Sequence, residues 1–107
     1  MTSFDDRERA AETKFARDED MAFRITARRN KLTGQWAAGK MALTPEETDS
    51  YAKSVVQADF EEAGDEDVIR KLLGDITAAG VATNDEEIRA ILAEKTIEAR
   101  RQLMESQ

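Results

Sequence analysis

The sequence predicts an all-α protein, a small four-helix bundle that begins with a long helix. Residues that favour helices dominate the 107-residue chain, and Pro45 is its single proline. Apolar residues recur at spacings of three and four, which is typical of helices with one buried face. Short segments with capping and turn residues separate four such stretches, and this favours a bundle with short connections. An apolar content of 40% suffices for the core of one small domain.

The first predicted helix is the longest and runs from about residue 3 to about residue 39, either as one helix or as two joined near residue 20. Its second half carries an apolar stripe of Met21, Ile25, Leu32 and Trp36. Its first half has no comparable stripe, because Phe4 and Phe15 are its only large apolar side chains apart from Met1. We therefore expect only the second half to join the core.

The first twenty residues are unusually charged, with seven acidic and four basic side chains. Acid-before-base pairs four residues apart, Asp5 with Arg9 and Asp20 with Arg24, favour a helix by about 0.2–0.5 kcal/mol each. Because an isolated helix of this length is marginal in water, we expect residues 1–19 to be a mobile arm that becomes firmly helical against a partner. Most charge-rich helices are plain, solvated faces, and on composition alone this interpretation is favoured over an interaction arm.

The second predicted helix begins with a strong capping signal. Thr44 is followed by Pro45, and Glu47 stands three residues after the threonine, as in a capping box. We expect this helix to run to about Ala63, with Gly64 in a left-handed conformation after it.

The third and fourth predicted helices also have recognisable ends. We expect Asp65 to cap the third helix and Gly80 to end it. Thr83 or Asn84 is expected to cap the fourth, with a glutamate completing a capping box. The predicted buried residues of these two helices are Val68, Ile69, Leu72, Leu73, Ile76, Ala79, Ile88, Ile91, Leu92, Ala99 and Leu103. The predicted aromatic core residues are Trp36, Tyr51 and Phe60.

Composition excludes several functional classes. The chain has no cysteine and no histidine, so it lacks thiolate metal ligands and the commonest general base. A net charge of −7 argues against general nucleic-acid binding. We find neither a membrane span nor an apolar leader segment, and expect a cytoplasmic protein, monomeric when free, with no enzymatic activity and no cofactor.

Charge is distributed unevenly along the chain. Residues 21–40 hold five basic side chains and no acidic one, whereas residues 41–67 hold nine acidic side chains and one basic one. The simpler interpretation is that the basic stretch packs beside the acidic one within the fold. The alternative is a small regulatory bundle that binds a nucleotide or another anion through Arg28, Arg29 or Lys40.

Two stretches resemble ligand-binding motifs and are better explained by helices. Residues 34–40 fit the pattern G-x-x-x-x-G-K of a phosphate-binding loop, but Met41 stands where a serine or threonine would bind Mg²⁺, and the surrounding pattern is helical. Residues 59–67 are rich in carboxylates but lack the alternating ligand order of a calcium loop. We therefore predict neither a phosphate loop nor a metal site.

The sequence resembles a known family, the zeta subunits of the F-type ATP synthases of α-proteobacteria. The resemblance covers nearly the whole chain and is strongest over residues 4–70. It rests on the strings FDDRERA from residue 4, ARRNKL from residue 27, YAK from residue 51 and ADFEEAGDEDV from residue 58, together with Gly34 and Trp36-Ala37-Ala38. Thr33 and Gln35 depart from it, since leucine is common at these positions in the family.

The resemblance implies an inhibitor of ATP hydrolysis whose N-terminal segment enters the interface between the α and β subunits of the ATPase head, near γ. It implies two parts, an inhibitory arm of residues 1–19 and a bundle of residues 20–107. The protein would then lie in the cytoplasm, peripheral to the inner membrane through the ATP synthase. The arm residues expected to contact the partner are Phe4, Asp5, Asp6, Arg7, Glu8, Arg9, Ala11, Glu12 and Phe15.

Overall fold

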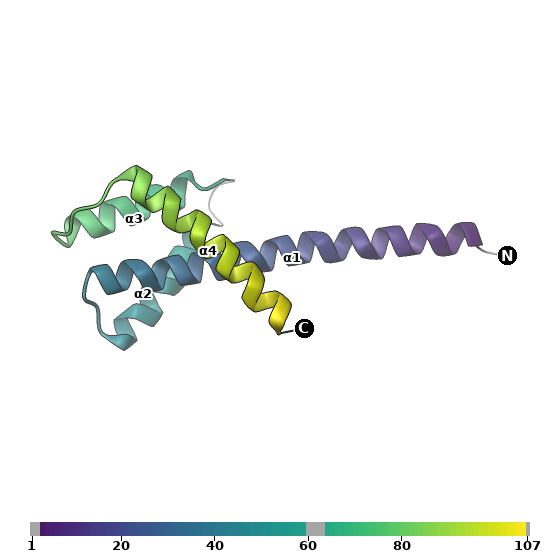
Figure 1. The fold of residues 1–107 in the computed structure, drawn as a ribbon, viewed down its shortest axis with the longest axis horizontal. Coiled ribbons are helices and arrows are strands. Elements are labelled where there is room, and N and C mark those ends of the chain that lie inside the picture. The colour runs from purple at the N-terminus through teal and green to yellow at the C-terminus, as the bar shows by residue number, and fades with distance from the viewer. Residues whose placement is uncertain (1–2, 60–63, 107) are drawn as a thin grey trace.

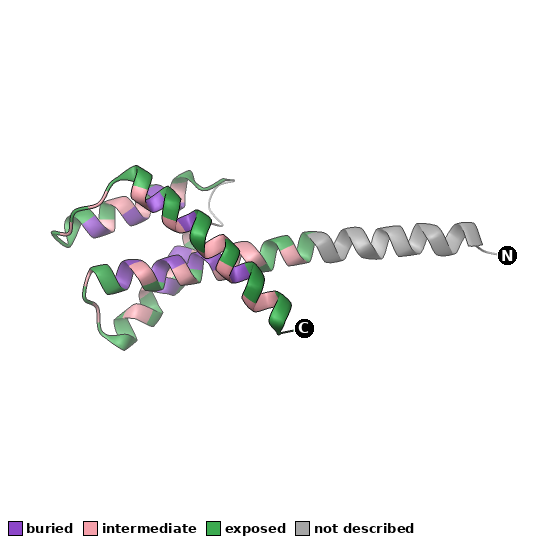
Figure 2. Cartoon of the chain, in the orientation of Figure 1, coloured by how far each residue is buried: buried purple, intermediate pink, exposed green. Residues whose placement is uncertain are grey.

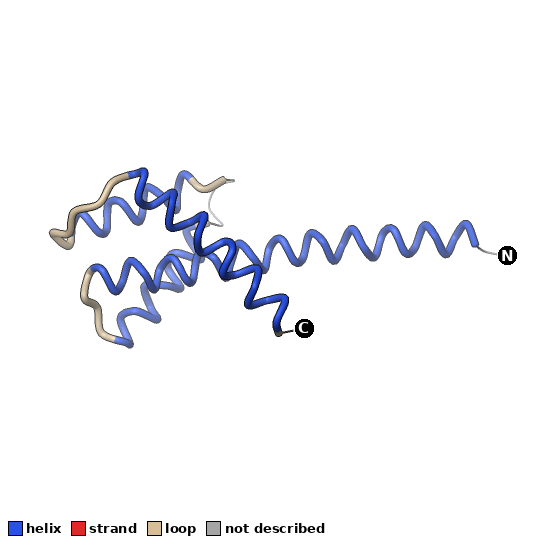
Figure 3. The backbone as a smooth tube through the Cα atoms, viewed as in Figure 1, coloured by secondary structure: helices blue, strands red, loops and turns tan. Residues whose placement is uncertain are grey.

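The fold is all-α, as predicted. The computed structural model describes the backbone of residues 3–59 and 64–106, and the side chains of residues 19–59 and 64–106. Within these ranges the chain forms four helices and no strand (Figure 3). The helices are α1 (Ser3–Lys40), α2 (Pro45–Ala58), α3 (Glu66–Ala78) and α4 (Asp85–Glu105).

Helix α1 is one continuous helix of 38 residues, so the two-helix alternative for this segment is wrong. At 1.5 Å per residue it is about 57 Å long, and it accounts for most of the 67 Å length of a molecule only 26 by 21 Å across. Its second half lies against α2 and α4, whereas its first half reaches well beyond the other three helices (Figure 1). The bundle therefore occupies one end of the molecule.

The predicted helix starts are largely confirmed. The Thr44 hydroxyl accepts a hydrogen bond from the Glu47 backbone N–H at 3.2 Å, and the Glu47 carboxylate accepts one from the Thr44 N–H at 2.9 Å. This completes the capping box of α2, with Pro45 as the first helical residue. The Asn84 side chain caps α4 by accepting from the Glu87 N–H at 2.7 Å, but the Glu87 carboxylate binds Thr83 and Lys40 instead of completing a box.

One predicted helix end and one predicted cap need correction. Helix α2 ends at Ala58 and not near residue 63. The acidic residues that follow it are unfavourable at a helix C-terminus, which carries the negative end of the dipole. Gly64 and Gly80 do have positive φ values, 92° and 82°. Asp65 precedes α3, but its side chain makes no capping hydrogen bond, since its backbone is helical (φ −97°, ψ −4°) and not extended as at Thr44 and Asn84.

The core lies where the four helices meet (Figure 2). Its buried members are Ala37, Val55, Val68, Ile69, Leu72, Ile76, Ile88 and Leu92. Trp36 and Tyr51 are partly buried and pack against this core, as expected for aromatic residues at its edge. Ala79, predicted to be buried, is exposed because it follows the last residue of α3. The prediction for Phe60 lies outside the described residues.

The buried face of α1 differs from the predicted one. The large residues Met21, Ile25, Leu32 and Trp36 are only half-buried. The fully buried positions carry small or polar side chains, namely Asn30, Thr33, Ala37 and Ala38. The cause is a close approach to α2 at Gly34, where a Cβ atom would lie only 2.8 Å from the Cα atom of Ala52. Large side chains do not fit where two helices approach so closely.

Candidate functional site

The predicted partner-binding residues, from Phe4 to Phe15, lie in the first half of α1. Figure 1 shows this part of the helix extending past the ends of α2, α3 and α4. Their side chains lie outside the described residues, so the predicted contacts of the arm stay predictions. What the backbone establishes is that the segment continues α1 without interruption.

The stem of the arm, where α1 leaves the bundle, carries exposed side chains. Asp20 and Arg24 form the predicted ion pair, with 3.0 Å between the carboxylate and Nε. Both side chains are about 60% exposed, so the pair contributes little to stability. Phe23 is 55% exposed, which is unusual for a phenylalanine in a folded domain.

Arg29 joins α1 to the start of α3. Its side chain is only 10% exposed and donates to the Asp65 carboxylate at 2.9 Å. It also donates from Nε and Nη2 to the Asn30 side-chain oxygen, at 3.1 and 2.9 Å. The Thr33 hydroxyl donates to the Arg29 backbone carbonyl at 2.8 Å. A buried cation with several acceptors is a structural element of the fold.

Lys40 joins the other end of α1 to α4. Its Nζ lies 3.2 Å from the Glu87 carboxylate and 5.3 Å from the centre of the Trp36 ring. A hydrogen bond from the Thr83 hydroxyl, and secondarily one from Lys40, lowers the pKa of the Glu87 carboxyl. The Arg29–Asp65 pair joins the basic stretch of α1 to the acidic stretch, as the simpler interpretation expects, whereas the partner of Lys40 lies outside residues 41–67.

The three residues considered for an anion site have separate partners. Arg28 donates from Nη1 to the Gln102 side chain at 3.0 Å, whereas Arg29 and Lys40 bind Asp65 and Glu87. Eleven positions, or about 17 Å of helix, separate Arg29 from Lys40. The structure therefore does not bring the three together, and anion binding by any one of them stays a prediction.

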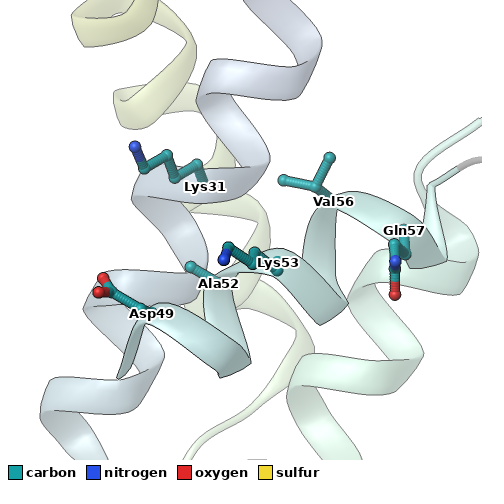
Figure 4. A pocket seen from close by; sticks show the side chains of 6 residues that line it. All are labelled: Lys31, Asp49, Ala52, Lys53, Val56 and Gln57. Carbon is teal, nitrogen blue, oxygen red and sulfur yellow. The ribbon is translucent and has the colours of Figure 1, made fainter. Parts of the chain in front are cut away.

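The structure shows a groove that the sequence analysis missed, between α1 and α2. It has a volume of about 480 Å³ and is lined by Lys31, Asp49, Ala52, Lys53, Val56 and Gln57 (Figure 4). Lys31 comes from α1 and the other five from α2. The sequence could not predict this groove, because isolated lysines are common on helix surfaces. The groove arises from the way α1 and α2 cross.

A second groove adjoins the first along α1. It shares Lys31 and Val56 with it and extends to Phe23, Arg24 and Arg28 on α1 and to Leu103 on α4. We call the two together the basic groove. It begins at the stem of the arm and combines cations with partly exposed apolar side chains.

The phosphate-loop pattern does not form a loop in the structure. Residues 34–40 are helical within α1, so their amides are not arranged as a loop around a phosphate. Among the described residues, no group of three or more acidic side chains is placed to hold a metal ion. Nor is any described helix long and apolar enough to span a membrane.

These features place the chain in the class of all-α proteins with a small helical bundle and one projecting helix. A family model described as ATPase inhibitor subunit zeta matches residues 1–102, and the chain belongs to this family. The family is regulatory and acts on the ATP synthase, as the sequence resemblance implied.

A solved structure supports the fold. A protein whose structure was determined by solution NMR is 44% identical and superposes with a TM-score of 0.73, covering 81% of this chain and 99% of that one. No curated protein matches the chain.

Proposed function

We propose that this protein inhibits ATP hydrolysis by inserting residues 1–19 into an α/β catalytic interface of the F-type ATPase head, beside γ. The bundle, residues 20–107, stays outside the head and limits how far the arm enters. Membership of the inhibitor family supports the choice of partner. The observation that carries the mechanism is α1, a continuous helix with only its second half against the bundle.

The arm has suitable dimensions for a wedge. Residues 3–19 span about 25 Å as a helix. Phe4 and Phe15 stand eleven positions apart, which is about three turns, so they share one side of the helix. We propose that these two side chains fill apolar pockets of the interface and that the charged residues 5–9 fix the register. Aromatic anchors surrounded by charged residues commonly dominate the energy of such contacts.

Inhibition requires that the arm prefer one conformation of the interface. A ligand that bound every rotary state equally would shift no equilibrium and would not stop the cycle. The pockets for Phe4 and Phe15 must therefore exist mainly in a partly closed α/β pair. The contacts must also offset the conformational entropy lost when the arm becomes fixed.

Removal of the arm tests the proposal most directly. We expect a variant that lacks residues 1–19 to leave ATP hydrolysis by the isolated ATPase head uninhibited, even in excess. Thermal unfolding of the variant must show that its bundle still folds. Full inhibition by the folded variant would contradict insertion of the arm.

Substitution of the anchors is a narrower form of the same test in the full chain. The double variant Phe4→Ala and Phe15→Ala should weaken inhibition by at least about tenfold, since loss of an anchor typically costs more than 1 kcal/mol. Thr13→Ala is the matched control, because residue 13 lies on the opposite side of the helix from Phe4. An equal loss in both variants would argue against aromatic anchors.

A further inference from the structure

The basic residues of the described chain fall into two groups. Most of them lie within ion-pair distance of a carboxylate, as Arg29, Lys40 and Arg70 do. Among the described residues, those without such a carboxylate are Arg28, Lys31, Lys53, Arg100 and Arg101. In a chain of net charge −7, cations without a carboxylate partner are a local exception.

Three of these cations line one surface. Arg28, Lys31 and Lys53 all belong to the basic groove, and Asp49 is the one acidic side chain among the described residues that line it. Lys31 and Lys53 are exposed, and Arg28 is half-buried. Their charges therefore add at this surface and are not neutralised by the fold.

The same surface is partly apolar. Phe23 is 55% exposed at one end of the groove, and Val56 and Leu103 are half-buried along it. Apolar side chains within a charged rim are typical of protein interfaces. Binding of a small inorganic anion would not require these apolar side chains.

The position of the groove on α1 indicates which partner would contact it. It starts at Phe23 and Arg24, four to five residues after the arm ends, on the same uninterrupted helix. A protein that encloses residues 1–19 must therefore have the rim of its cleft against the surface around the stem. This argument rests on the proposed function, because it takes the insertion of the arm as given.

We propose that the basic groove docks onto an acidic, partly apolar rim of the cleft in the ATPase head that receives the arm. The chain is acidic overall, so an acidic partner is repelled by most of its surface and attracted at the groove. Such a distribution orients the encounter so that the arm faces the cleft. Docking thus supplies the association rate and orientation, and the arm supplies the arrest.

Charge reversal at Lys31 tests the proposal. We expect Lys31→Glu to slow association with the isolated ATPase head by about tenfold at low salt. The difference from the unaltered protein should shrink as salt rises from about 20 mM to about 300 mM, because the Debye length shortens. Lys53→Glu should act in the same direction.

Arg70→Glu is the matched control, since it changes the net charge equally but lies on α3 and outside the basic groove. The Arg70 side chain is 75% exposed but that of its partner Asp67 only 13%, so Arg70→Glu leaves Asp67 beside a like charge and is expected to lower stability somewhat. We expect Arg70→Glu to leave the association rate within about twofold of the unaltered protein, as befits a charge outside the interface. Thermal unfolding checks that all the variants are folded.

Equal effects of Lys31→Glu and Arg70→Glu would overturn the docking inference. A second result would also overturn it. If Lys31→Glu left association unchanged but abolished saturable binding of ATP, measured by Trp36 fluorescence, the groove would be an anion site.

The proposed function and the docking inference can be refuted independently. If the variant that lacks residues 1–19 still inhibits fully, the proposed function fails. If that variant loses inhibition while Lys31→Glu matches Arg70→Glu, only the docking fails.

Discussion

Gly34 sets the distance between α1 and α2. A Cβ atom at this position would lie 2.8 Å from the Cα atom of Ala52 and 3.3 Å from side-chain atoms of Ala52 and Val55. The nearest of these is a backbone atom, so a rotamer change cannot relieve the clash and the two helices must separate. A close approach of this kind also explains why small and polar residues cover the buried face of α1.

We expect Gly34→Ala to lower the free energy of unfolding by about 1–2 kcal/mol, because overpacking outweighs the better helix propensity of alanine. Gly74 provides a control, since it lies inside α3 with no neighbouring atom within 4 Å of the added Cβ. Gly74→Ala should raise the free energy of unfolding by about 0.5–1 kcal/mol. Urea unfolding at equilibrium measures both. Stabilisation by Gly34→Ala would show that the helices can separate at no cost.

The helix starts are sites of pH-dependent stability at the level of the elements. Hydrogen bonds from the Thr44 backbone and side chain lower the pKa of Glu47 in the first turn of α2. The hydrogen bond from Thr83, and then that from Lys40, lowers the pKa of Glu87 in the first turn of α4. In both cases the folded state favours the ionised form, so below its ordinary pKa of 4.5 the unfolded state binds more protons.

The contribution of Glu87 to stability is therefore fully present above its ordinary pKa of 4.5 and is lost as the pH falls through the lower folded-state pKa. We expect Glu87→Gln to be less stable than the unaltered protein at neutral pH, and the gap to close in acid. Urea midpoints across a pH series measure the gap. Because the chain has no histidine, the difference in stability between Glu87→Gln and the unaltered protein should stay constant from about pH 7 to about pH 5. Closure already above pH 5 would contradict the assignment to Glu87.

At the scale of the whole molecule, α1 is both a bundle helix and a projecting arm. The arm continues the same helix that lines the basic groove, so in its helical form it points away from the bundle in line with the groove. Ala22 is an exposed position at the stem, before the first groove residue. A break in the helix at this position would separate the arm from the bundle helix and leave the packing of the core unchanged.

We expect Ala22→Pro to weaken inhibition while the thermal midpoint of the bundle stays unchanged. Proline removes one backbone hydrogen bond and collides with the preceding turn, at a local cost of about 3 kcal/mol to the helix. Ala22→Ser is the control that keeps the backbone donor. ATP hydrolysis by the isolated head and thermal unfolding are measured side by side. Undiminished inhibition by Ala22→Pro would mean that the direction of the arm is unimportant.

The helices and their starts were predictable because they depend on local chemistry. The Thr44 box and the Asn84 cap involve residues three positions apart, and the buried residues of α3 follow one helical period. The buried face of α1 was not predictable in the same way. Large residues at helical spacing suggested Leu32 and Trp36, but the contact with Ala52 at Gly34 favoured the small and polar side of the helix.

The sequence was sufficient to predict the helical class, the caps of α2 and α4, the lack of an apolar stripe in the first twenty residues and the family. The packing of the helices, in contrast, establishes which cations pair with carboxylates of the fold and which line the basic groove. The pairs Arg29–Asp65 and Lys40–Glu87 join residues 36 and 47 positions apart. Helix period and capping act over a few residues, whereas partners at such separations are chosen by how the helices pack.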